Sequence, residues 1–144
     1  MKHKYFTLEE LIRSNTATTK GIDNTPSWEV VEQLDLLVSE ILDPLREAWG
    51  KPIRISSGFR CPRLNQAVGG AATSVHKIGA AADMQTPGNF SKFRDFVKAW
   101  LLENNIAFDQ LLVEKRKKDG AQWLHIGRIN NAGQQRKQIQ VMVV

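Results

Sequence analysis

A histidine and an aspartate stand seven positions apart in one short stretch of small residues. The stretch is SVHKIGAAADM, residues 74–84, and it contains His76 and Asp83. An imidazole and a carboxylate are ligands that zinc takes in proteins, and the neighbouring glycine and alanines leave room for an ion, a water molecule and a substrate. The spacing predicts a metal site. The alternative is a loop histidine with an aspartate that caps a helix or a turn.

A third metal ligand is available in the segment WLHIGR, which contains His125. In a strand, His125 shares one face with Trp123 and Gly127. Its polar ring then lies between a large indole and a glycine that has no side chain, which suggests a pocket. Two histidines and one aspartate leave the fourth position of zinc for water, as in catalytic sites. A closed structural site usually recruits cysteines, and Cys61 is the only thiol. The alternative for His125 is a partly buried strand histidine.

Helices are predicted in the N-terminal third of the chain. Residues 7–14 open with a capping box formed by Thr7 and Glu10. Residues 19–24 then break this helix. A long core helix starts with Thr25 as its N-cap and a proline in its first position. Its apolar residues recur at helical spacing: Val30, Val31, Leu34, Leu37, Val38, Ile41 and Leu45.

Two further features complete the predicted helices. Pro44 is expected to kink the long helix or to start a separate last turn before Gly50. Residues 91–105 form the last predicted helix, whose aromatic stripe faces the core. The stripe comprises Phe93, Phe96, Val97, Trp100 and Leu101.

Alternating apolar residues predict strands, most of them late in the chain. A turn at Gly79 leads into one of them, so that Ala81 shares a strand face with Asp83. Asp119-Gly120 is expected to form a two-residue turn, and NNAGQQ to connect the last two strands. This order predicts an α+β fold with a small antiparallel sheet, ending in a meander, backed by helices. The strands are expected at residues 52–57, 81–85, 107–114, 121–128 and 137–144.

The length, charge and hydropathy of the chain limit the classes of protein to which it can belong. The 144 residues are enough for one core and predict a single domain spanning residues 1–144. The net charge of +5 favours polyanions such as nucleic acid or an anionic cell wall, but no nucleic-acid motif accompanies the basic residues. No apolar run has the length of a signal peptide core or of a membrane span. We therefore expect synthesis in the cytoplasm, and a monomer.

Three motifs resemble one known family. SVHKIGAAAD matches the S-x-H-x-x-G-x-A-x-D signature of the zinc D-alanyl-D-alanine carboxypeptidase and dipeptidase family, which includes phage L-alanyl-D-glutamate endolysins. WLHI resembles its second histidine motif, and ISSGFR resembles its S-G-x-R segment. The likeness runs from about Phe6 to Arg128 and is greatest to short phage-type members. It implies the fold shared with Hedgehog signalling domains.

The resemblance also implies roles for single residues. His76, Asp83 and His125 would hold zinc. Ser74 would help to bind substrate, and Arg60 would stabilise the oxyanion or the substrate carboxylate. The alternatives are a turn hydroxyl for Ser74 and one of many solvated cations for Arg60.

One position departs from the family pattern. Several members carry the general base, a glutamate or aspartate, three residues before the second histidine, where this chain has Gln122, whose amide cannot accept a proton at neutral pH. Glu114 is the predicted replacement. A two-residue turn would pair Lys118 with Ala121 and bring Glu114 directly opposite His125. The Hedgehog strand FDWVYYE also resembles FDQLLVE here. The alternative is an exposed acid that pairs with the adjacent lysines and arginine.

Together these features predict a zinc metallopeptidase that hydrolyses peptide bonds in the peptidoglycan stem peptide. The scissile bond, which is D-Ala-D-Ala, L-Ala-D-Glu or a cross-bridge, stays open, because loop shapes decide it. A phage-type lysin would accumulate in the cytoplasm and reach the cell wall after release. The alternative function is a zinc-containing module that binds murein peptides or a protein partner without hydrolysis.

Overall fold

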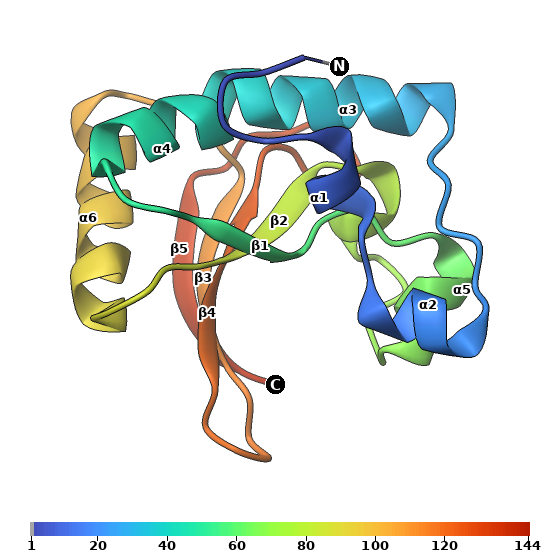
Figure 1. The fold of residues 1–144 in the computed structure, drawn as a ribbon. Coiled ribbons are helices and arrows are strands. Elements are labelled where there is room, and N and C mark those ends of the chain that lie inside the picture. Colours follow the sequence, from blue (N-terminus) through green and yellow to red (C-terminus); the bar gives the residue numbers. More distant parts are fainter. Residues whose placement is uncertain (1) are drawn as a thin grey trace.

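The structure, a computed structural model, describes residues 2–144 and centres on a five-stranded sheet (Figure 1). The strand order is β1-β2-β4-β3-β5. Neighbouring strands are antiparallel except for β3 and β5, which are parallel. The strands are β1 (Arg54–Ser57), β2 (Ala81–Gln85), β3 (Gln110–Lys115), β4 (Gln122–Gly127) and β5 (Gln138–Val143).

Helices surround this sheet, which confirms the predicted α+β class. In Figure 1, α3 and α4 cross the top of the molecule, α6 stands along the left side, and α2 and α5 lie together at the right. The α-helices are α1 (Leu8–Ile12), α2 (Asn15–Lys20), α3 (Trp28–Leu37), α4 (Asp43–Trp49), α5 (Pro62–Ala67) and α6 (Phe90–Glu103). A π-helical segment, η1 (Val38–Leu42), joins α3 to α4, and a 3-10 helix, η2 (Val75–Ile78), precedes β2.

The two faces of the sheet serve different purposes, because side chains alternate along each strand. Met84, Leu111 and Leu124 are fully or almost fully buried in the main apolar core, together with residues of α3, α4 and α6. Asp83 and His125 belong to the alternate set and line an open cleft. Helices α3, α4 and α6 therefore pack on one face of the sheet, and Asp83 and His125 lie on the other.

The short N-terminal helices match the prediction only in part. The capping box is confirmed: Thr7 Oγ1 accepts a hydrogen bond from the backbone N–H of Glu10 at 3.3 Å. The predicted break at residues 19–24 is right only in part. The first helix, α1, already ends at Ile12, and α2 continues to Lys20 before the chain turns at Gly21, whose φ is +64°. The sequence pattern does not predict α2 or α5. Helices of one or two turns show too little apolar periodicity to be recognised.

The long helix starts later than expected. Its N-cap is Ser27, whose Oγ accepts from the backbone N–H of Val30 at 3.3 Å. The expected N-cap, Thr25, instead bonds through its hydroxyl to Asp23 at 2.6 Å. Pro44 stands in the first turn of α4, directly after η1, so the regular α-helix is interrupted next to the proline, where a kink or a separate last turn is expected.

The predicted meander is wrong at β5. Both neighbours of β4 are already present, β2 on one side and β3 on the other, so β5 cannot pair with it. The connection instead carries the chain to the free edge of β3. There Arg136 bonds to Asp109 through two guanidinium contacts of 2.8 and 2.9 Å. The backbone N–H of Gln138 donates to the carbonyl of Asp109 at 2.8 Å, which starts the parallel ladder.

The β3–β4 hairpin has a longer loop than the predicted two-residue turn. The backbone N–H of Arg116 donates to the carbonyl of Ala121 at 2.8 Å, so the loop spans residues 117–120. The Asp119 carboxylate accepts from the Arg116 guanidinium at 2.9 and 2.8 Å and from the N–H of Ala121 at 3.1 Å. These contacts stabilise the longer loop over the turn that Asp-Gly favours.

The longer loop changes the register of the hairpin. Glu114 lies opposite Trp123, and Leu112 lies opposite His125, so the predicted pairing of Glu114 with His125 is wrong. The error is two residues, which is one full period of a strand. Glu114 therefore keeps the predicted face of the sheet.

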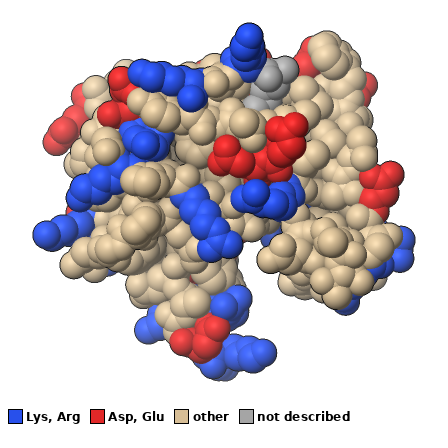
Figure 2. Space-filling view, viewed as in Figure 1, with Lys and Arg blue, Asp and Glu red and all other residues tan. Residues whose placement is uncertain are grey.

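The surface carries scattered positive charge. Figure 2 shows lysine and arginine atoms spread over the visible face, including the hairpin that projects at the bottom. The hairpin tip contains the run from Lys115 to Lys118, beside Asp119. None of the helices described in residues 2–144 has both the length and the apolar character needed to cross a membrane.

Candidate metal centre

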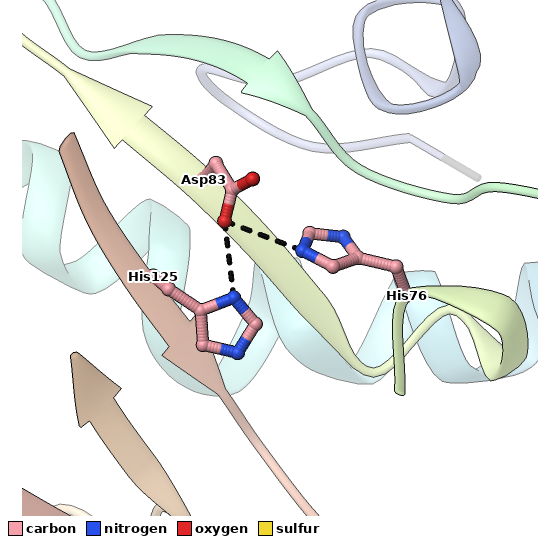
Figure 3. Close-up of side chains that lie close together, drawn as sticks. All are labelled: His76, Asp83 and His125. Atoms are coloured by element: carbon pink, nitrogen blue, oxygen red, sulfur yellow. Dashed lines mark hydrogen bonds and ion pairs between the residues drawn. The ribbon is translucent and has the colours of Figure 1, made fainter. Parts of the chain in front are cut away.

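The structure brings His76, Asp83 and His125 together from three separate elements, η2, β2 and β4 (Figure 3). His76 Nε2 lies 3.2 Å from Asp83 Oδ1, and His125 Nδ1 lies 3.0 Å from the same oxygen. The three candidate ligand atoms are all within 4.8 Å of one another. Ligand atoms at about 2.0–2.2 Å from one tetrahedral zinc ion lie about 3.3–3.6 Å apart, so the cluster fits such an ion after small adjustments.

The sheet register positions two of these residues. Asp83 lies directly opposite His125 in the antiparallel pair of β2 and β4. The third, His76, lies on η2. This helix ends at Gly79, where a turn is expected and where the backbone has the left-handed conformation, with φ +78°. A Cβ at Gly79 would lie 2.9 Å from the carbonyl oxygen of Val30, so glycine also permits the close approach of η2 to α3.

A backbone carbonyl orients the ring of His76. Its Nδ1 lies 2.6 Å from the carbonyl oxygen of Gly58. Because that oxygen can only accept, Nδ1 carries the proton, and in the neutral ring the lone pair is on Nε2, which faces Asp83. Such a contact on the far side of an imidazole is usual for metal-binding histidines.

The cluster attracts positive charge. Burial by itself would raise the pKa of Asp83, but the adjacent His76 and His125 outweigh it and hold that pKa far below its usual range. Burial likewise acts to lower the pKa of His125, but the hydrogen bond and charge of Asp83 and the charge of Glu114 raise it overall. The carboxylate thus stays ionised among two bases, which is the electrostatic setting for a bound cation.

A cleft of about 1090 Å³ opens over the three residues. Its lining combines acidic, basic and apolar side chains. Polar residues include Arg60, Ser74, Glu114 and Arg136, and apolar ones include Leu112, Trp123, Met142 and Val144. A peptide with charged and small apolar groups suits such a surface.

Glu114 lies at the edge of the cluster, although its register differs by two residues from the predicted one. Its Oε1 is 3.8 Å from His125 Nδ1 and accepts a hydrogen bond from Trp123 Nε1 at 3.0 Å. Gln122, by contrast, is exposed, and strand parity places it on the opposite face from Trp123 and His125. The structure therefore places the Glu114 carboxylate beside the cluster, whereas Gln122 lies on the other face of the sheet.

Arg60 and Ser74 contact each other in the lining of the cleft. Arg60 Nη2 donates to Ser74 Oγ at 3.3 Å, and the same oxygen accepts from the backbone N–H of His76 at 3.2 Å. Burial lowers the pKa of Arg60, while the charges of Asp83 and Glu114 act to raise it. Ser74 therefore serves as the cap of η2, as the turn-hydroxyl alternative expects, and also as a partner of Arg60.

Two residues that contact the candidate site residues, Gly58 and Trp123, are not given these roles by the sequence analysis. Gly58 supplies the carbonyl that orients His76, and the only signal for it is its place in the S-G-x-R segment. Trp123 is expected only as a pocket wall, and its indole N–H contact with Glu114 follows from the longer hairpin loop. Cys61 caps α5, its Sγ 3.4 Å from the N–H of Leu64, and is absent from the cleft lining.

Comparison with known proteins identifies a family of peptidases. The family model described as Peptidase M15 matches residues 4–126. The zinc D-Ala-D-Ala carboxypeptidase of Streptomyces albus G is 38% identical over 80 residues, which cover 55% of this chain and 30% of that protein. The match therefore spans less than a third of the relative's own length.

Proposed function

Since this chain belongs to the peptidase M15 family, as its motifs predict, we propose that it is a zinc metallopeptidase acting on peptides of the peptidoglycan stem. The family and the zinc-dependent relative bear out the predicted class of enzyme. The observation that carries the proposal is the convergence of His76, Asp83 and His125 in a cleft that also holds Glu114.

The three clustered residues are the proposed zinc ligands. His76 would bind through Nε2, because Nδ1 is engaged by Gly58, and His125 through Nδ1, the nitrogen that faces Asp83. Three protein ligands leave one coordination position open, as in catalytic sites. Zinc held there supplies the Lewis acidity that polarises a carbonyl group and makes water a nucleophile at neutral pH.

Glu114 is the proposed general base. Three acidic residues line the cleft, and two of them are engaged elsewhere: Asp83 lies between the histidines, and Asp109 is held by Arg136. Glu114 has no lysine or arginine within ion-pair distance in the described structure, which argues against the alternative of a surface ion pair. Its carboxylate would take a proton from the attacking water and pass it to the leaving amine.

Arg60 and Ser74 are proposed to bind the substrate. The Arg60 guanidinium uses one donor on Ser74, and its remaining outer donors can reach a carboxylate or a developing oxyanion in the cleft. The relative's name describes a D-Ala-D-Ala carboxypeptidase, which makes that bond one candidate. The L-Ala-D-Glu bond and a cross-bridge are the others. A lysin that reaches the wall after release is the proposed setting, with the chain acting as a monomer and one domain.

Hydrolysis of purified muropeptides, followed by mass spectrometry, tests this function. Wild-type protein should release a product whose mass identifies the scissile bond. Glu114→Gln should retain zinc and lower the rate by about 100-fold or more. Glu103→Gln, a matched change of an exposed glutamate on α6, should leave the rate unchanged.

The same assay decides between the proposal and its alternative. A wild-type protein that binds zinc and muropeptides but releases no product would support the non-hydrolytic module, which Gln122 in place of the family's acid favours. A Glu114→Gln variant as active as wild type would exclude Glu114 as the base.

A further inference from the structure

We propose that Trp123 is a positioning residue whose indole N–H holds Glu114 back from the metal, so that Glu114 stays free as a base and does not become a fourth zinc ligand. The proposal rests on the proposed function for the role of Glu114 and of the metal ligands. Its physical basis is the geometry of one cross-strand pair.

Glu114 and Trp123 lie directly opposite each other on β3 and β4. Trp123 Nε1 donates to Glu114 Oε1 at 3.0 Å, and the Glu114 side chain is only 17% exposed. The indole nitrogen can only donate a hydrogen bond, and the ionised Glu114 carboxylate accepts it. The indole therefore cannot accept a proton that Glu114 takes from water. The contact therefore fixes the direction of one carboxylate oxygen.

Glu114 needs such a restraint because it lies just outside the metal cluster. Its Oε1 is 3.8 Å from His125 Nδ1, whereas Asp83 Oδ1 is 3.0 Å from that atom. The set of mutually close ligand atoms contains His76, Asp83 and His125 but not Glu114. Carboxylates bind zinc readily, and a three-ligand set has a vacant position. An unrestrained Glu114 that turned toward the ion would fill this position and remove the base.

The hairpin loop in turn holds Trp123. The guanidinium of Arg116 lies over the indole ring, 5.7 Å from its centroid, within the range of a cation–π contact. Asp119 fixes that guanidinium through two hydrogen bonds. The loop over residues 117–120 thus supports the indole, and the indole supports the carboxylate.

Zinc affinity of the resting protein, measured by competition with a chelator, tests the restraint without any substrate. Trp123→Phe keeps the ring and loses the N–H, so the freed carboxylate should bind the metal and lower the Kd for zinc by about tenfold, while kcat/KM falls by about tenfold or more. A residue that merely supports the site would have the opposite effect on affinity, a loss of about 10–100-fold.

A double variant identifies the group responsible. In a Glu114→Gln background, Trp123→Phe should leave zinc affinity unchanged, because no carboxylate remains to bind. Trp28→Phe, at a tryptophan that is 71% exposed, controls for the loss of an indole. Thermal unfolding reports whether the variants fold, and Trp123→Leu replaces Trp123→Phe if that variant does not.

Two results would overturn the restraint. One is a zinc Kd for Trp123→Phe that is unchanged or higher than that of wild type. The other is a gain in affinity that persists in the Glu114→Gln background. The proposed function fails separately, through an absence of muropeptide hydrolysis, since the affinity measurement does not depend on turnover.

Discussion

The Nδ1 atom of His76 lies 2.6 Å from the carbonyl oxygen of Gly58, and this contact decides which ring nitrogen faces Asp83. The peptide group that contains this carbonyl is itself held by a hydrogen bond. The neighbouring N–H, that of Phe59, donates to the carbonyl of Leu11 at 2.7 Å. The C-terminal end of α1 thus supports the backbone that orients a candidate metal ligand 65 residues later in the chain, at position 76 against position 11.

Gly58→Ala tests this support. A Cβ at position 58 would lie 2.2 Å from the carbonyl oxygen of Leu11, so the peptide or α1 must move. We expect a loss of about 1–3 kcal/mol in the free energy of unfolding and a zinc affinity lower by about 10–100-fold. Urea denaturation and chelator competition measure the two effects. Arg54→Ala, an exposed change on β1, four residues before Gly58, should alter zinc affinity little. Wild-type affinity in Gly58→Ala would show that the carbonyl contact is dispensable.

One zinc ion is expected per chain, with two histidines and one aspartate as ligands. Asp83→Ala or His125→Ala should remove it, because two remaining ligands cannot hold the ion against competing water and chelators. Metal analysis of protein purified without chelator measures the content. His3→Ala is the matched control, since His3 bonds to Asp35 at 2.6 Å, away from the cluster. Full zinc content in either ligand variant would refute the assignment.

Stability should fall in acid through Asp109. Hydrogen bonds from Arg136 hold the pKa of this buried carboxyl below its usual range. A lowered folded-state pKa means stabilisation that is present above the unfolded pKa of about 3.9 and is lost as pH falls through the folded value. Asp109→Asn should cost about 1–3 kcal/mol at neutral pH, and its difference from wild type should shrink as the pH falls below about 5 and through the lowered pKa of folded Asp109.

Urea denaturation across this pH range gives the comparison. Asp95→Asn is the control, because the Asp95 side chain is 70% exposed in its pair with Arg94, and such pairs contribute little. A difference between Asp109→Asn and wild type that stays constant with pH would contradict the linkage.

The scattered basic surface is expected to promote encounter with an anionic cell wall and to leave catalysis unaffected. The net charge is +5, and screening acts mainly on exposed charges, over a Debye length of about 10 Å at 0.1 M salt. Added salt should weaken binding to whole sacculi and change the turnover of a small soluble muropeptide little. Equal salt sensitivity in sedimentation and turnover assays would argue against this role.

The candidate ligands were predictable because residue type and spacing carry the chemistry directly. His76, Asp83 and His125 need only a strand pair and a turn to meet, and both leave signals in the sequence: alternation around Asp83 and His125, and Gly79 at the turn. The face of Glu114 was predictable for the same reason, since strand parity survives a register error of two.

Contacts between segments that are distant in the sequence determine the placement of α2 and α5 and the length of the hairpin loop, which the sequence does not predict. The side-chain amide of Asn24 donates to the carbonyls of Ile12 and Phe59 at 2.8 and 3.0 Å, and its oxygen accepts from the N–H of Cys61 at 2.8 Å. These bonds fasten the chain around α2 and α5, and no local periodicity reports them. The loop length depends likewise on the Arg116–Asp119 pair, which a preference for Asp-Gly turns does not anticipate.

The two edges of the sheet differ in their exposure to intermolecular strand pairing. β1 is short, carries Arg54 and has an irregular register at Ile55 and Ser57, all of which discourage another chain from adding to it. β5 has six residues, and the segment from Ile139 to Val144 contains neither a charge nor a proline. Val141 and Val143 there are 74% and 65% exposed. Such a segment is a template for aggregation, so self-association of this protein at high concentration would begin at β5.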